Sequence, residues 1–244
     1  LKVPDRFLPL QNEGDVISSR ATYLDTIGWA VHNTLLPDSQ ALSITVVVDG
    51  AATDAQQVIA RRYVDSCVKA FKTAPVLARY APFVNIAYIN KKSPQAGVSY
   101  GIGGVPKTTR YGTHFKHLTV DRALGCDSLD RLKNEVMAQF PETDITLVLA
   151  YDGKYGGLAV VDTTTSFQYI SAGIDLQTGW SLTDETAVHE FMHWLGLSDE
   201  YLDTAACNHF PYIIYGGNIT HDTVYHRTWD HWLGTSGIGY VSGG

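Results

Sequence analysis

Two histidines and a glutamate near the C-terminal third of the chain have the residue types and spacing of a metal-assisted hydrolytic site. Residues 189–193 read HEFMH. Residues four apart on a helix lie one above the other, so both imidazoles can reach one ion at about 2.0–2.1 Å, the length of a zinc–nitrogen bond. The pattern therefore predicts a zinc site with His189 and His193 as ligands. In this motif the carboxylate of Glu190 does not bind the metal but takes a proton from the attacking water, as general base.

The residues around this motif predict a helix that positions it. Ser181 or Thr183 can cap the N-terminus, and Asp184 and Glu185 would then lie in the first turn, where the helix dipole favours negative charge. Apolar residues at helical spacing predict that one face of the helix is buried. They are Val188, Phe191, Met192 and Leu195.

A catalytic zinc needs three protein ligands and one open position. Gly196 allows a sharp turn after the helix, which brings Asp199 and Glu200 back toward the histidines. Asp199 lies ten residues after His189, where the extended motif H-E-x-x-H-x-x-G-x-x-H places its third ligand, and a carboxylate can replace the imidazole there. We favour Asp199. Glu200 is the competitor, because its longer side chain could reach the metal if the turn were wound differently.

The composition excludes several classes of partner. The 25 acidic residues outnumber the 18 basic ones, and no run of Lys or Arg is longer than two, which argues against nucleic acid. No stretch approaches the roughly 20 apolar residues of a membrane span. Three cysteines, Cys67, Cys126 and Cys207, are too few for a disulfide framework. Because the chain begins with Leu rather than Met, we expect that an upstream segment was removed. We also expect a secreted protein and a monomer.

The elements expected around the motif indicate an α/β fold. Residues 1–40 show little periodicity and are predicted to be an arm that packs over a catalytic domain formed by residues 41–244. Apolar runs predict the strands, and helical spacing predicts two further helices. The strands are 42–48, 83–89, 145–150, 158–161 and 167–171, and the helices are 54–72 and 128–139.

Pairing of these strands follows from their order and spacing. The first strand, helix and second strand form a unit whose two strands should run parallel. Strands 145–150 and 158–161 are separated by a distance typical of a hairpin, so we expect them to pair with each other. Residues 90–127 are rich in glycine and are predicted to be a loop with one short strand near Leu118.

The chain resembles the M64 peptidases, also called IgA peptidases, which belong with the metzincin-like zinc proteases. The likeness spans roughly residues 42–240, and the HEFMH helix followed by Asp199-Glu200-Tyr201 is its most specific part. Its other segments are VDG at 48–50, FVNI at 83–86, SPQAG at 93–97, RALGCD at 122–127, DITLVL at 144–149, YGGLA at 155–159 and WDHWL at 229–233.

The resemblance implies a zincin-type fold and peptide-bond hydrolysis, with the ligand role on His189, His193 and Asp199 and the base role on Glu190. The chain departs from the family pattern in two ways. One residue fewer separates the second histidine from the Asp-Glu-Tyr segment. Neither methionine, Met137 or Met192, follows the motif, where metzincins have a methionine turn.

The sequence thus predicts a zinc-dependent endopeptidase that acts on proteins or peptides. We expect a zincin-like fold with a twisted mixed β-sheet, backing helices and an HExxH active-site helix. Residues 158–161 should form an edge strand to which an extended substrate can pair. Two alternatives stay open: a zincin-like binding module without catalysis, and a small neutral protease of the snapalysin type.

Overall fold

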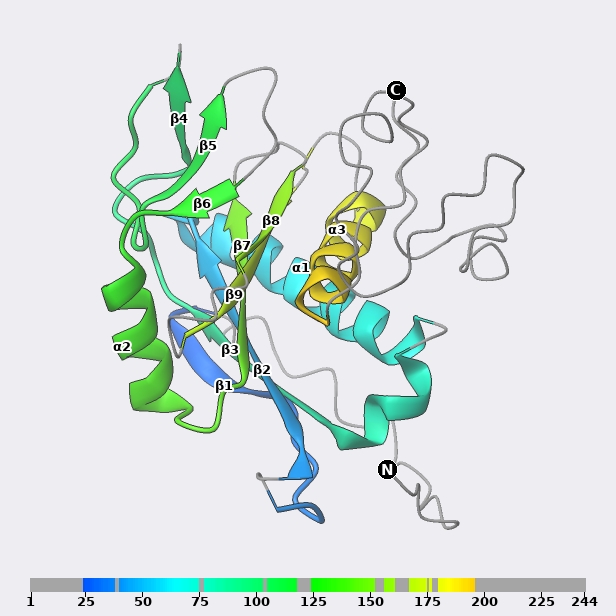
Figure 1. Cartoon of the computed structure of the whole chain (residues 1–244). Coiled ribbons are helices and arrows are strands. Elements are labelled where there is room, and N and C mark those ends of the chain that lie inside the picture. The colour runs from blue at the N-terminus through cyan, green and yellow to red at the C-terminus, as the bar shows by residue number, and fades with distance from the viewer. Residues whose placement is uncertain are drawn as a thin grey trace, which may run out of the picture.

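The computed structural model describes residues 24–37, 40–74, 77–102, 105–117, 124–151, 156–160, 167–174, 176 and 180–195. Within these ranges the chain forms a six-stranded sheet, a separate three-stranded sheet and three α-helices (Figure 1). The predicted mixed α/β architecture is therefore confirmed. The two candidates for the third ligand, Asp199 and Glu200, lie outside the described residues.

The six-stranded sheet has parallel strands in its middle and an antiparallel strand at each edge. Its order is β1 (Thr26–Val31), β3 (Val84–Asn90), β2 (Leu42–Asp49), β7 (Ile145–Tyr151), β9 (Tyr169–Ile174) and β8 (Gly157–Val160). The strands β3, β2, β7 and β9 run parallel, whereas β1 and β8 run antiparallel to their neighbours. Every residue of β7 is buried. This is expected of a central strand that is covered on both faces.

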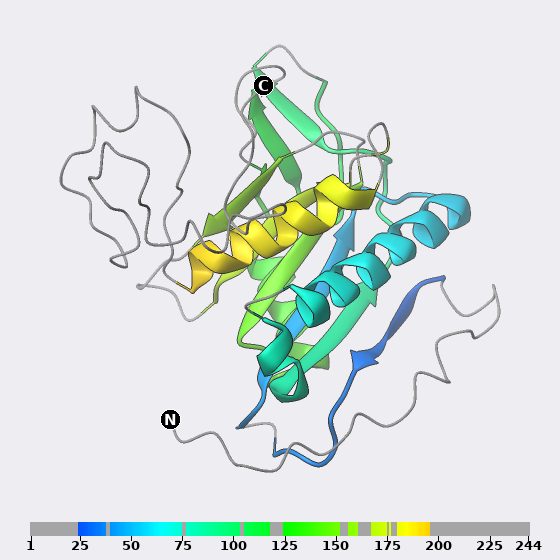
Figure 2. The ribbon, with the colours of Figure 1, turned by 90° about the vertical axis from the view of Figure 1, so that its right-hand side faces the viewer.

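Helices cover both faces of this sheet. The helices α1 (Asp54–Thr73) and α3 (Trp180–Trp194) lie side by side on one face, and α2 (Leu129–Gln139) lies on the other (Figure 1 and Figure 2). A short 3-10 helix, η4 (Ala78–Phe83), leads into β3. Successive side chains of a strand point to opposite faces. Accordingly, Val46 packs in the core on the side of α1 and α3, and Val47 packs in the core beside α2.

The segment predicted to be a loop with one short strand near Leu118, residues 90–127, contains three short strands, one of which ends at His117. They are β4 (Ser99–Ile102), β5 (Thr113–His117) and β6 (Leu124–Cys126), and they form the smaller sheet in that order. Strands this short and this poor in β-branched residues give little hydrophobic alternation to detect. A hydrogen bond links β6 to the main sheet, because the hydroxyl of Ser171 in β9 donates to the carbonyl of Leu124 at 2.7 Å.

Two further predictions about the sheet are wrong. Residues 26–31, expected to be part of an irregular arm, form the edge strand β1, which pairs with β3. The strands β7 and β8 do not form a hairpin, because β9 lies between them and pairs with both. β7 has parallel partners on its two sides, β2 and β9, so it has no free edge for β8. The prediction that residues 158–161 lie at the sheet edge agrees with the observed place of β8.

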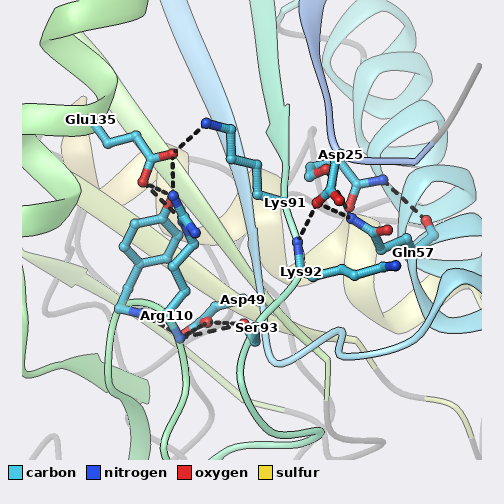
Figure 3. A network of polar contacts seen from close by, with 10 residues as sticks. Asp25, Asp49, Gln57, Lys91, Lys92, Ser93, Arg110 and Glu135 are labelled. Carbon is cyan, nitrogen blue, oxygen red and sulfur yellow. Dashed lines mark hydrogen bonds and ion pairs between the residues drawn. The ribbon is translucent and has the colours of Figure 1, made fainter.

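A fully buried carboxylate, that of Asp49 at the end of β2, fastens the smaller sheet to the main one. It accepts hydrogen bonds of 2.6–3.3 Å from three hydroxyls and four backbone N–H groups. Figure 3 shows part of this network. The hydroxyls belong to Ser93, Thr109 and Thr113, and the N–H groups to Gly50, Arg110, Tyr111 and Thr113. Hydrogen bonds to a carboxylate offset the cost of burying it.

Arg110 extends this network to α2. Its guanidinium donates to both carboxylate oxygens of Glu135, at 2.9 and 2.8 Å, and the Tyr111 hydroxyl donates to the same group at 2.9 Å. Burial opposes the charged form of Glu135, but the hydrogen bonds from Arg110 and Tyr111 prevail and hold its pKa below the ordinary value. The loop before β5 is thus attached to the end of β2 and to the helix on the far face of the sheet.

We predict that Asp49→Asn lowers the free energy of unfolding by about 3 kcal/mol, because the NH2 group that replaces one carboxylate oxygen cannot accept its hydrogen bonds and faces several donors in a buried place. Urea denaturation of the purified variant measures this change.

The matched control is Asp127→Asn, which makes the same change on a side chain that is 74% exposed. It should alter the free energy of unfolding by less than about 0.5 kcal/mol. Equal stability of the two variants would show that the hydrogen bonds to Asp49 do not hold the smaller sheet in place.

Candidate metal and catalytic site

The helix α3 carries residues 189–193 and is held by its apolar face. Val188, Phe191 and Met192 are buried, as predicted, and the ring of Phe191 meets that of Phe71 in α1 edge to face, with 5.1 Å between centroids. Leu195 departs from the prediction: it lies just beyond the last helical residue and is 49% exposed. The apolar face of α3 therefore packs against α1 and the sheet.

The start of α3 differs from the predicted one. The helix begins at Trp180, so Thr183 lies inside it and is not a cap, and its hydroxyl donates to the carbonyl of Gly173 in β9 at 3.1 Å. Asp184 and Glu185 are consequently not in the first turn. The hydroxyl of Ser66 in α1 donates to Asp184. Burial raises the pKa of Asp184 above its ordinary value, against the effect of the Ser66 hydrogen bond.

The two histidines of the motif meet through their ring nitrogens. The Nε2 atoms of His189 and His193 lie 3.0 Å apart, with the rings nearly perpendicular at 84°. Two nitrogens bound to one tetrahedral zinc at about 2.0–2.1 Å would be about 3.4 Å apart. The observed separation is about 0.4 Å shorter than that, so a small rotation of the side chains would let both nitrogens bind one ion. The donor pair fits a zinc ion.

Glu190 is buried at the edge of the sheet. Glu190 and His189 are each only 8% exposed to solvent. The helix packs against β9 and β8, and the first residue of β8, Gly157, lies against the Glu190 carboxylate. The carboxylate is therefore next to the strand edge to which a peptide could add. In the sequence, Gly157 stood out only as part of the segment YGGLA at 155–159, and no signal there shows the approach of α3 that makes this residue part of the site.

The last turn of α3 is held by an indole. Trp194 donates through Nε1 to the side-chain oxygen of Gln168, which lies just before β9, and its ring packs on Phe191 with 5.4 Å between centroids. His193, one residue earlier, is thereby fixed relative to β9. The turn that follows, with Asp199 and Glu200, lies beyond the described residues.

The structure thus brings together three of the four predicted site residues: His189, Glu190 and His193. Among the described residues, no group of three or more His, Cys, Asp and Glu side chains is arranged to hold a metal ion.

None of the described helices is long and apolar enough to span a membrane.

Comparison with known proteins gives the family. No curated protein matches the chain. A family model described as IgA Peptidase M64 matches residues 32–236, a range that includes β2 to β9 and all three α-helices. The site helix α3 lies well inside that range. The chain therefore belongs to the M64 family of peptidases, and it is a protease by family.

Proposed function

We propose that this M64 peptidase is a zinc-dependent endopeptidase with a zincin-like fold, in which His189 and His193 bind the metal. The observation that carries the proposal is the 3.0 Å approach of the two Nε2 atoms on one helix, beside a buried glutamate. Each neutral imidazole has one nitrogen with a lone pair. A cation bound by both histidines would accept the lone pair of each. We further propose Asp199 as the third ligand, on its spacing alone, with Glu200 as the alternative.

Zinc at this position would supply Lewis acidity, which polarises the scissile carbonyl and makes a water molecule acidic enough to lose its proton near neutral pH. Glu190 is the proton acceptor in the proposal. One oxygen of its carboxylate takes the proton of the attacking water and later gives it to the nitrogen of the leaving amine. Its burial against β8 limits the directions in which the carboxylate can turn, so the proton acceptor keeps a fixed place beside the strand edge.

The substrate peptide would pair with the outer edge of β8. In an antiparallel ladder, hydrogen-bonded and non-hydrogen-bonded pairs alternate. The N–H of Gly173 donates to the carbonyl of Gly156 at 2.7 Å, so the next residue, Gly157, turns its own N–H and C=O away from β9, as does Ala159. No other described strand pairs with that side of β8. An extended chain can add there through main-chain hydrogen bonds, which suits cleavage within a peptide.

The rival function is a zincin-like module that binds a partner without catalysis. Such a module has no need for a carboxylate beside the metal ligands, so the presence of Glu190 favours the enzyme. The match to the M64 model over residues 32–236 favours an M64 peptidase over the smaller snapalysin type. Secretion and the monomeric state stay predictions.

We predict that removal of zinc abolishes proteolysis. The chain, dialysed against a strong chelator, should lose cleavage of casein and of an internally quenched peptide, and addition of zinc should restore both. Elemental analysis should find one zinc ion per chain in the active protein. Cleavage by metal-free protein at the untreated rate would contradict the proposal.

We also predict that Glu190→Gln keeps the fold and the bound zinc but lowers kcat by at least about two orders of magnitude, the usual worth of a general base. The peptide assay gives kcat, and elemental analysis gives the zinc content.

The control is Glu185→Gln, the same isosteric change on an exposed residue of the same helix, and it should leave kcat close to that of the unchanged chain. If Glu190→Gln retains full kcat, Glu190 has no part in the reaction.

A further inference from the structure

Gly157, the first residue of β8, is packed too closely to carry a side chain. A Cβ atom built on it would lie 2.7 Å from Oε1 of Glu190, 2.7 Å from Cγ2 of Thr186 and 2.8 Å from the carbonyl oxygen of Ser171. All three distances are shorter than real Cβ contacts. The φ angle of Gly157 is outside the left-handed region, so its backbone conformation is open to any residue. Only the lack of space requires glycine here.

The three neighbours differ in how easily they can move. The Ser171 carbonyl belongs to the backbone of β9, which is hydrogen-bonded to strands on both sides. Thr186 is buried, and its β-branched side chain has few rotamers open to it on a helix. Glu190 has the longest side chain and its contacting atom is the terminal oxygen. A methyl group at position 157 would therefore displace the Glu190 carboxylate most readily, and β8 would also have to shift slightly away from Thr186 and Ser171.

Gly157 also has a role on the opposite side of its backbone. Its N–H and C=O point away from β9, to the side of β8 on which no described strand pairs, as the ladder alternation requires. The same residue thus faces the substrate edge and touches the proposed base. The space between the strand and the carboxylate is too small for a side chain at this point.

We propose that Gly157 is a positioning residue for proteolysis: by lacking a side chain it lets the Glu190 carboxylate rest against the strand that aligns the substrate. The position of the carboxylate relative to the scissile bond is then set by van der Waals contact with the backbone of β8. This inference rests on the proposed function of Glu190. Gly157 does not contact the metal in this proposal.

The test is Gly157→Ala, assayed with the internally quenched peptide. Because the methyl group displaces the base while a slight shift of β8 keeps the N–H and C=O of residue 157 directed outward, kcat should fall about 10- to 100-fold while KM changes less than about threefold. Zinc content should stay at one ion per chain, since neither histidine is touched. An unchanged kcat, or a loss confined to KM, would overturn the inference.

The matched control is Gly28→Ala, the same change in the strand at the opposite edge of the sheet. The three atoms nearest to a Cβ there all belong to the side chain of Tyr88, the closest being its hydroxyl oxygen at 3.2 Å, and no backbone atom is among them. This variant should have the kcat of the unchanged chain, which separates the effect at Gly157 from the general cost of alanine in an edge strand.

A double-mutant cycle with Glu190→Asp separates positioning of the base from distortion of the strand. The shorter aspartate withdraws its carboxylate from Gly157, so Gly157→Ala should lower kcat much less in that background than in the unchanged chain. Equal fold losses in the two backgrounds would mean that the methyl group acts by bending β8, and the inference would be wrong.

If Gly157→Ala does not fold, the pair Gly157→Ala and Thr186→Ser gives the same measurement, because it removes the Cγ2 atom and leaves the contact with Glu190. Its kcat should be about 10- to 100-fold below that of Thr186→Ser alone. Equal kcat values would overturn the inference. Failure of the proposed function looks different: the unchanged chain would then show no chelator-sensitive cleavage.

Discussion

The packing of α3 against the β8 end of the sheet is the contact on which the site depends. His189 and Glu190 are buried there, and burial of polar groups is costly unless other contacts compensate. The apolar stripe that includes Val188 and Phe191 supplies the burial that holds α3 in place. The Nε2 atoms of His189 and His193 are thereby brought to 3.0 Å from each other. In the proposed enzyme, metal binding and helix packing would stabilise each other.

The β8 edge is supported from both faces of the sheet. On one face, α3 packs directly against β8 and β9. On the other, β6 is joined to β9 by the Ser171 hydroxyl, which donates to the carbonyl of Leu124 and also reaches that of Leu158 in β8. The smaller sheet is in turn fastened at Asp49. A continuous set of hydrogen bonds thus runs from the end of β2 to the strand that the substrate would use.

The sequence allowed most of the central elements and the motif to be predicted, because each depends on local residue order. The buried run 145–150 and the HEFMH segment are examples. Predictions failed where long-range packing decides. The pairing of β8 depends on β9, which follows it in the chain, and the strand 26–31, with Gly28 in its middle, gives little alternation. Thr183 was predicted to be a cap from its residue type and place in the sequence. Its hydroxyl instead donates to the carbonyl of Gly173, which belongs to another element.

The antiparallel direction of β8 has a consequence for how a substrate can bind. In an antiparallel edge strand, every second residue turns both N–H and C=O outward, so a peptide forms paired hydrogen bonds at single residues. In β8 these residues are Gly157 and Ala159, the first of which touches Glu190. Because the strand is only four residues long, it offers little free backbone for aggregation. The register of a bound peptide and the position of the base would then be fixed by the same residue.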